Sequence, residues 1–286
     1  MPLLSLNELK QISPVFRGNA GSAFGKSLMH ILSIDKINDL YDSHSFLSGP
    51  DFAASVLEDV GFEYRIGFPD IMSTYGDNSM EILDSIIPDG PFITVSNHPC
   101  GHLDGVTLVD IFGHLRPDYK VMVNQILARI KPLEKNFISV TPVGNVRTVP
   151  TSASIRGVKD ALIHLHNGGA LGLFPSGAVS DLSLRDRSVR DREWQEAIIK
   201  LIIKAQVPIL PVRFFGGNSL FYYLLGLIDW RVRLLRLPAE VFNKKGRPMY
   251  IGIGNLISVE EQRCLWNDAD TFRDFLRTSV YGMTYV

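Results

Sequence analysis

The stretch FITVSNHPCGHLDG at residues 92–105 decides the fold that we expect for this chain. It begins with a short apolar run, passes through a polar turn rich in His, Gly and Asp, and leads into a candidate helix at 104–115. A strand that passes through such a turn into a helix is the repeating unit of α/β layer folds. Because functional residues in these folds gather where strands end and helices begin, the polar turn predicts a site.

The same alternation of short apolar runs and longer amphipathic segments continues along the chain. We expect strands at residues 92–95, 120–123, 137–140, 170–174, 208–214 and 249–253. We expect helices at residues 104–115, 152–166 and 192–205. This order favours an α/β fold with a mostly parallel central sheet flanked by helices.

The N-terminal part of the chain has a helical pattern instead. Apolar residues recur at helical spacing from Ser22 to Tyr41, and Pro50 precedes a second candidate helix at 51–60. The chain contains no internal repeat and no long linker. We therefore expect two parts, an N-terminal helical annex of residues 1–65 and a main domain of residues 66–286.

Length and composition exclude several classes of protein. A chain of 286 residues is too long for a peptide-sized module, and its formal net charge of -1 gives no basic field for wholesale nucleic-acid binding. The two cysteines, Cys100 and Cys264, are too few for a disulfide framework, and no secretory signal is visible, so we expect free thiols and a cytoplasmic location. No apolar run reaches the roughly 18 residues of a spanning helix, which leaves peripheral membrane attachment open.

His98 and Asp104, in the first polar turn, have the chemistry of a general base and its partner. The ordinary pKa of histidine lies near neutrality, and a nearby carboxylate can fix the tautomer and stabilise the imidazolium. Two alternatives stay open. Asp104 can simply cap the start of a helix. His98, His102 and Asp104 can instead share a metal ion, as in a metal-dependent hydrolase.

A second polar turn follows the expected strand at 170–174. It reads FPSGAVS from Phe174 to Ser180, and its Pro and Gly residues allow a ligand to approach the backbone closely. Backbone amides around Gly177 can hold an anion or an oxyanion. Ser176 does not form a nucleophile elbow, because Phe174 stands where that motif needs its first glycine. The alternative interpretation is an ordinary tight turn.

In their order along the chain these segments resemble the glycerolipid acyltransferase superfamily, which includes the 1-acyl-glycerol-3-phosphate acyltransferases. The resemblance rests on N-H-P-x-G-x-x-D-G at 97–105, F-P-x-G at 174–177 and VPILPV at 207–212, with a weak second block at 137–144. These four segments follow one another in the same order as the four conserved blocks of the superfamily.

Two departures from the superfamily pattern matter. Five residues, in place of the usual four, separate His98 from Asp104, so the connecting turn must differ for the pair to meet. Ser176 and Val179 stand where the superfamily has the Glu and Arg associated with glycerol 3-phosphate recognition. Without the Arg, whose guanidinium group can bind a phosphate through two hydrogen bonds, the pattern argues against glycerol 3-phosphate as the acceptor.

The variant pattern is similar to a bacterial subfamily of hemolysin-like proteins that includes the O-acyltransferases of ornithine- and glycine-lipid synthesis. Its members carry N-H-P-x-G-x-x-D-G and F-P-x-G-x-V-S. The likeness extends over most of the chain, through residues 32–41, 52–64, 142–145, Trp194, 218–219 and 221–245. It implies that residues 66–286 form an acyltransferase domain.

The resemblance implies an enzyme that moves a fatty acyl group from an acyl carrier protein or coenzyme A thioester to the hydroxyl of a lyso-lipid, either a lyso-ornithine or lyso-glycine lipid or a lysophospholipid. It implies His98 as the base, Asp104 as its orienting partner, and no cofactor. The substrate-binding residues that we expect are Asn97, His102, Phe174, Pro175, Ser176, Gly177, Ser180 and Arg185, with His102 also the fallback base. The expected partners are the thioester, the lipid acceptor and the inner face of the cytoplasmic membrane, and no nucleic acid.

Two further segments have both a functional and a structural interpretation. The arginines from Arg185 to Arg192, interleaved with aspartates, can bind an acceptor carboxylate or phosphate, or can form a solvated and charge-balanced loop. The apolar run at 221–228, followed by a basic cluster that ends at Arg247, suits either an anionic membrane surface or a buried helix with a basic rim. A lipid-binding protein without catalysis also remains an alternative.

Overall fold

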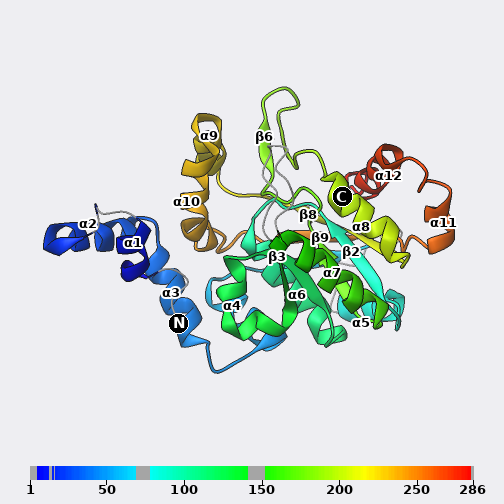
Figure 1. The fold of residues 1–286 in the computed structure, drawn as a ribbon, viewed down its shortest axis with the longest axis horizontal. Helices are drawn as coiled ribbons and strands as arrows, with labels where there is room; N and C mark the ends of the chain where they lie inside the picture. The colour runs from blue at the N-terminus through cyan, green and yellow to red at the C-terminus, as the bar shows by residue number, and fades with distance from the viewer. Residues whose placement is uncertain (1–4, 13–14, 16, 69–77, 141–151, 285–286) are drawn as a thin grey trace.

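The computed structural model describes residues 5–12, 15, 17–68, 78–140 and 152–284 (Figure 1). In this part of the chain the strands form one seven-stranded sheet and a separate two-stranded hairpin. Helices cover both faces of the sheet, and the N-terminal helices extend away from it (Figure 1).

The central sheet is mostly parallel. Its strands are β1 (Tyr64–Gly67), β2 (Phe92–Ser96), β3 (Lys120–Asn124), β4 (Phe137–Val140), β5 (Ala170–Leu173), β8 (Ile209–Phe215) and β9 (Met249–Ile253). Their order across the sheet is β1-β9-β8-β2-β5-β3-β4. The five strands from β8 to β4 run parallel, whereas β9 is antiparallel to β8. The expected α/β fold with a mostly parallel sheet and flanking helices is therefore confirmed.

Side chains of β2 alternate between two hydrophobic cores, one on each face of the sheet. Phe92 belongs to the core beneath α4 (Gly49–Asp59), α5 (Ser79–Ile86) and α6 (His102–Leu115). Ile93 and Val95 belong to the core beneath α7 (Ser152–His166), α8 (Glu196–Ala205) and α12 (Ala269–Tyr281). Because both faces of β2 are covered, its five residues are all buried, which explains why the strand has a continuous apolar run.

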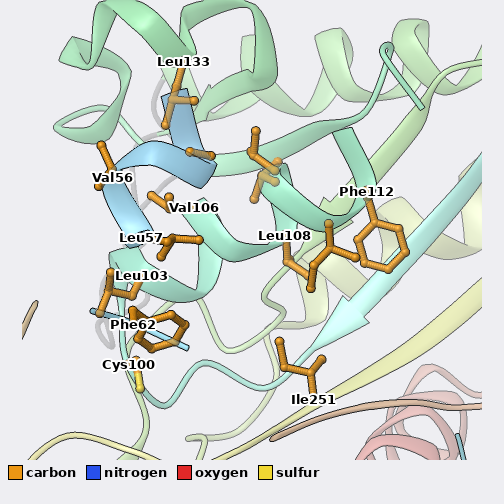
Figure 2. Packing of buried hydrophobic residues seen from close by; sticks show 14 of the residues in the cluster. Val56, Leu57, Phe62, Cys100, Leu103, Val106, Leu108, Phe112, Leu133 and Ile251 are labelled. Carbon is orange, nitrogen blue, oxygen red and sulfur yellow. The ribbon is translucent and has the colours of Figure 1, made fainter. Parts of the chain in front are cut away.

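α6 is the central helix of the first face. Residues 103–113 of this helix are all buried, and α4 packs along it with Val56 and Leu57 close to Leu103 and Val106 (Figure 2). The helix begins at His102, two residues before the expected start, because Asp104 occupies its third position and not its cap. Such close packing fixes the orientation of the first turn of α6 relative to β2.

Two expected helices differ from the structure. The segment at 22–41 forms α2 (Gly18–Ile31) and α3 (Ile34–Ser43), because Ser33 adopts a left-handed conformation with a φ of 58° that ends the first helix. The helix expected from residue 192 begins only at Glu196, since the preceding residues are extended and bury Trp194. The helix expected at 51–60 is α4, and it is preceded by α1 (Leu6–Ile12) and the two helices above.

Several short elements carry no strong periodicity and were not expected. β1 reads Tyr-Arg-Ile-Gly without an apolar run, and it forms by pairing with β9 at the edge of the sheet. The others are the hairpin β6 (Asp181–Ser183) and β7 (Ser188–Arg190), the 3-10 helices η2 (Leu127–Arg129) and η3 (Lys131–Asn136), and α11 (Val259–Arg263). The division of the chain at residue 65 stays a prediction; β1 spans that position.

The apolar segment at 221–228 lies in α9 (Leu220–Ile228), which pairs with α10 (Trp230–Val241). Tyr222 and Tyr223 are buried, but most of the aliphatic side chains of α9 are exposed. The interpretation of this segment as a buried core helix is therefore wrong. Within the described residues, no helix has the length and hydropathy needed to cross a membrane.

Candidate active site

Both polar turns lie at the same edge of the sheet. They follow β2 and β5, which are parallel neighbours, so their carboxyl ends adjoin. The turns are joined directly, since the Ser180 amide donates a hydrogen bond of 2.9 Å to the His98 carbonyl. Two segments about eighty residues apart in sequence thus form one site.

His98 and Asp104 meet in spite of the additional residue between them. His98 Nδ1 lies 3.0 Å from Asp104 Oδ2, and the Asp104 side chain is fully buried. Gly101 adopts a φ of 76°, a left-handed conformation that glycine takes without a Cβ penalty, and α6 starts immediately after it. The five intervening residues therefore fold back into a turn that places the imidazole beside the carboxylate.

Asp104 has a second task in the same place. Its Oδ2 accepts hydrogen bonds from the amides of Cys100 at 2.8 Å and Gly101 at 3.0 Å. These amides precede the first turn of α6, where a carboxylate is favoured by the helix dipole. Asp104 is thus not the cap residue itself, but from the third position of α6 one of its oxygens stabilises the helix start and also lies beside the histidine.

The His98 ring is held against Phe174. Their ring centroids are 4.1 Å apart with an interplanar angle of 31°. Because Nδ1 faces Asp104, Nε2 is the ring nitrogen left to meet a substrate. Nδ1 and Oδ2 are at contact distance without hydrogen-bond alignment, as is common for catalytic pairs before substrate binds.

Asp191 is a site residue that the sequence analysis did not single out. Its Oδ1 accepts hydrogen bonds from the His98 amide at 3.1 Å and the Ser180 hydroxyl at 2.6 Å, while Oδ2 accepts one from Trp194. Burial raises the pKa of this carboxyl. In the sequence it stands in a run of alternating charges that resembles a solvated loop, and only the nearby Trp194 hints at burial. Asp191 ties both polar turns together.

The second polar turn is built around Ser176 and Gly177. Ser176 is buried, and its hydroxyl donates to the carbonyl of Ala178. Gly177 has a φ of 62°, and a Cβ there would clash with Nε2 of Gln195, which itself donates to the Ser176 carbonyl. The Gly177 amide already donates to Phe174 within the turn. Pro175 accepts a hydrogen bond from the Gln195 amide.

The remaining expected residues lie in different surroundings. His102 lines the pocket described below, and burial, with smaller effects of His98 and Lys244, lowers its pKa to about 4. Asn97 uses its side-chain amide to bind both the amide and the carbonyl of Phe214 in β8, which joins the ends of two strands. Arg185 is exposed in the turn between β6 and β7 and is not among the pocket residues.

An apolar pocket of about 440 Å³ opens beside His98, which is within the usual range of about 300–1,000 Å³ for ligand sites. His98, His102 and Phe174 lie at one part of its wall. The aliphatic part of the wall consists of Met122, Val123, Leu127, Val140, Ile155, Val158, Leu173 and Ile198. The pocket combines the His98 imidazole with an apolar surface that suits a hydrocarbon chain.

The positions of the His, Cys, Asp and Glu side chains bear on the metal-site alternative and on the reactivity of the two cysteines. Across the described residues, no three His, Cys, Asp or Glu side chains lie close enough together to hold a metal ion. The expectation of free thiols is confirmed for Cys100 and Cys264. Burial, followed by the charge of Asp104, raises the pKa of Cys100, which keeps this thiol protonated. The segment 142–145 and the end of the second block lie outside the described residues.

Known proteins are similar to this chain over most of its length. Two relatives, the lyso-glycine lipid O-acyltransferases of Bacteroides thetaiotaomicron and Phocaeicola vulgatus, are each 25% identical over 240 residues, or 80% of this chain and 79% and 77% of theirs. The solved structure of the 1-acyl-sn-glycerophosphate (LPA) acyltransferase PlsC from Thermotoga maritima has a TM-score of 0.46 and 15% identity, and covers 82% of this chain and 80% of that one.

A family model for acyltransferases matches residues 64–283, a range that includes the whole sheet and both polar turns. The resemblance drawn from the sequence is thereby confirmed at the level of the family. The metal-dependent hydrolase and the non-catalytic lipid binder are not what this family describes. The chain belongs to the acyltransferase family and is an enzyme of acyl transfer.

Proposed function

We propose that this protein transfers a fatty acyl group from a thioester of acyl carrier protein or coenzyme A to the hydroxyl of a lyso-lipid, without a cofactor. The observation that carries the proposal is the pair of His98 and Asp104, 3.0 Å apart, beside an apolar pocket. A base next to a hydrocarbon-sized pocket suits a reaction whose two substrates both have long acyl chains.

In the proposed step His98 Nε2 takes the proton of the acceptor hydroxyl while that oxygen attacks the thioester carbonyl carbon. Asp104 holds the imidazole through Nδ1 and stabilises the imidazolium. The tetrahedral intermediate collapses with cleavage of the C–S bond, and the leaving thiolate takes the proton from His98. The products are an O-acyl lipid and a free thiol, and His98 returns to its neutral form.

The pocket is assigned to an acyl chain. Its aliphatic side chains come from β3, β4, β5, η2, α7 and α8, so the chain would lie along the carboxyl end of the sheet, next to the helices of the second face. Each buried CH₂ group contributes about 0.8 kcal/mol of binding free energy. His98 and Phe174 lie in the pocket wall, where a reacting carbonyl at the end of the chain can reach Nε2.

The acceptor assigned first is a lyso-amino-acid lipid, and second a lysophospholipid. The relatives named lyso-glycine lipid O-acyltransferase favour the first. Ser176 is buried and hydrogen-bonded within its turn, and Val179 packs against Tyr222 and Tyr223, so neither position offers a charged group to a phosphate. Because the acceptor is a membrane lipid, the proposal also places the enzyme at the inner face of the cytoplasmic membrane.

The test is transfer of labelled palmitate from acyl carrier protein, and separately from coenzyme A, to lyso-ornithine lipid, lyso-glycine lipid and lysophosphatidic acid. We expect wild-type protein to acylate an amino-acid lipid and His98→Ala to lose that transfer. Preferred transfer to lysophosphatidic acid would reverse the order of acceptors. Absence of transfer to every acceptor in the presence of lipid vesicles would contradict the proposal.

A further inference from the structure

The outer face of α9 and α10 has the densest group of exposed apolar side chains in the described structure. Half of the 18 large hydrophobic residues that are exposed there fall within residues 220–235. Those of α9 are Leu220, Phe221, Leu224, Leu227 and Ile228, with exposures from 46% to 81%. Their spacing of three and four residues places them on one helical face, and that face points away from the protein.

We infer that this outer face of the α9–α10 hairpin docks on an anionic lipid bilayer and holds the active site at its surface. The inference rests on the proposed function in one respect, since an enzyme that acylates a lyso-lipid has to reach that lipid in a membrane. The docking surface is defined as the exposed apolar residues of 220–235.

Charge around the docking surface fits an anionic bilayer. Residues 220–247 contain six Lys and Arg against two acidic residues, Asp229 and Glu240; Arg233 and Lys244 are buried, which leaves at most four of the cations for the surface, although the whole chain has a net charge of -1. Lys245 and Arg247 are exposed just beyond α10, and Arg236 lies over the Phe221 ring. Near-surface cations each contribute about 1 kcal/mol of attraction to anionic lipids, which adds to the apolar contact.

The inner face of the same hairpin is bound to the two polar turns of the site. Tyr223 donates a hydrogen bond of 3.2 Å to the Pro99 carbonyl, directly after His98. The buried Arg233 of α10 donates to the carbonyls of Val179 at 2.9 Å and Ser180 at 3.1 Å. A bilayer bound to the outer face would therefore lie one helix layer from both turns.

The neighbouring β6–β7 hairpin belongs to the same projecting part of the molecule. Figure 1 shows α9, α10 and this hairpin together beyond the edge of the sheet, and α9 contacts β6. Leu184 at its turn is 68% exposed, with exposed Arg185 and Arg187 beside it. An apolar tip flanked by arginines repeats the composition of the docking surface, and it supplies a second point of contact with the same bilayer.

A second copy of this chain is the rival occupant of the apolar face. The excess of cations in 220–247 disfavours it, because a symmetric contact would bring these charges together. An anionic bilayer meets the same charges with the opposite sign. The observations therefore favour lipid over self-association.

The test measures co-flotation with vesicles of phosphatidylglycerol and phosphatidylethanolamine, and with phosphatidylcholine vesicles, using the full chain without substrate. Leu227→Asp is the test variant and Ile163→Asp on α7 is its matched control, because the two residues are 47% and 48% exposed. We expect wild type and Ile163→Asp to bind the anionic vesicles, Leu227→Asp to bind at least about tenfold less, and all three to bind phosphatidylcholine weakly.

Equal loss in both variants, or unchanged binding of Leu227→Asp, would overturn the inference. Wild-type protein that fails to bind vesicles but sediments as a dimer, which Leu227→Asp converts to monomer, would assign the face to self-association. Circular dichroism melting checks that each variant is folded, and Ile228→Asp serves if Leu227→Asp is not. Vesicle binding needs no acyl transfer, so a failed transfer assay beside intact docking would count against the proposed function alone.

Discussion

Oδ2 of Asp104 lies 3.0 Å from Nδ1 of His98 and accepts the amides of Cys100 and Gly101 at the same time. The start of α6 and the orientation of the His98 imidazole therefore depend on a single oxygen atom. Any change in the turn that carries Cys100 and Gly101 moves the carboxylate relative to the imidazole. In the proposed mechanism, catalysis and local folding are therefore coupled at this point.

His98→Ala removes the base, and we expect the rate of acyl transfer to fall about 10²–10⁴-fold. His166→Ala is the control, because His166 is exposed on α7 and does not line the pocket. The measurement is kcat with a saturating thioester donor. A His98→Ala enzyme with more than a tenth of wild-type kcat would remove His98 from the role of base.

Asp104→Asn and Asp104→Ala separate the two tasks of this side chain. Asparagine keeps an oxygen for the Cys100 and Gly101 amides but lacks the charge that stabilises the imidazolium, so kcat falls, less than in His98→Ala, with a small change in Tm. Alanine leaves two buried amides unpaired, at a cost of about 1–3 kcal/mol each. Thermal melts and kcat of both variants give the comparison, and equal Tm values for Asn and Ala would contradict it.

Asp191→Ala tests whether this buried carboxylate positions His98. Loss of the hydrogen bonds to the His98 amide and the Ser180 hydroxyl frees both turns, so we expect a lower kcat with little change in KM for the donor. Asp186→Ala, at an exposed acid of the same run, should match wild type. Asp191→Asn keeps an acceptor oxygen and should therefore have a higher kcat than Asp191→Ala. If the kcat values of the two variants are equal, the negative charge of Asp191, and not its hydrogen bonds to the two turns, accounts for the effect.

His102 gives the protein a pH-dependent stability. Its pKa in the folded protein is about 4, below the ordinary value of 6.5, because burial disfavours the charged form. The unfolded chain binds the proton more tightly, so stability is fully present above pH 6.5 and is lost as pH falls towards 4, by on the order of 3 kcal/mol. Tm measured between pH 7 and pH 4.5 should fall less in His102→Gln than in wild type, and equal slopes would count against this assignment.

Gly177→Ala introduces a contact with Gln195 in addition to strain at positive φ. Gly246 has a φ of 72° and no atom within 4 Å of an added Cβ, so Gly246→Ala reports the strain alone, about 1–2 kcal/mol. We expect Gly177→Ala to lower Tm more than Gly246→Ala. Combining Gly177→Ala with Gln195→Ala should remove the excess, and a double variant no more stable than Gly177→Ala would contradict the contact.

Much of the fold follows from local pattern. Both faces of β2 are covered by helices, so side chains on both faces are buried. For this reason the sequence of the strand is a run of mostly apolar residues, Phe92–Val95, which predicts a buried strand. β1 cannot be predicted in this way, since Tyr64 to Gly67 contains no apolar run. This strand forms by pairing with β9, which lies far along the chain. The break at Ser33 also has no sequence signal, because the apolar spacing continues across it.

The residues of the candidate site also differ in whether the sequence predicts them. His98 and Asp104 are close in sequence, so one turn brings them together and their types alone suggest the chemistry. Asp191 contributes through contacts with His98, 93 positions away, and with Ser180 and Trp194, and its neighbours in sequence are charged residues. A carboxylate whose hydrogen-bond donors lie partly in a distant segment cannot be told from a solvated one by local pattern.

The position of β2 between β5 and β8 bears on how the protein is made. During synthesis from the N-terminus, β2 receives its first neighbour when residues 170–173 emerge and its second only when residues 209–215 follow. Until then a strand that is fully buried in the folded protein has an open edge, which is the kind of surface that pairs with other chains. We therefore expect the nascent chain to be most prone to pairing through β2 until residues 209–215 have joined the sheet.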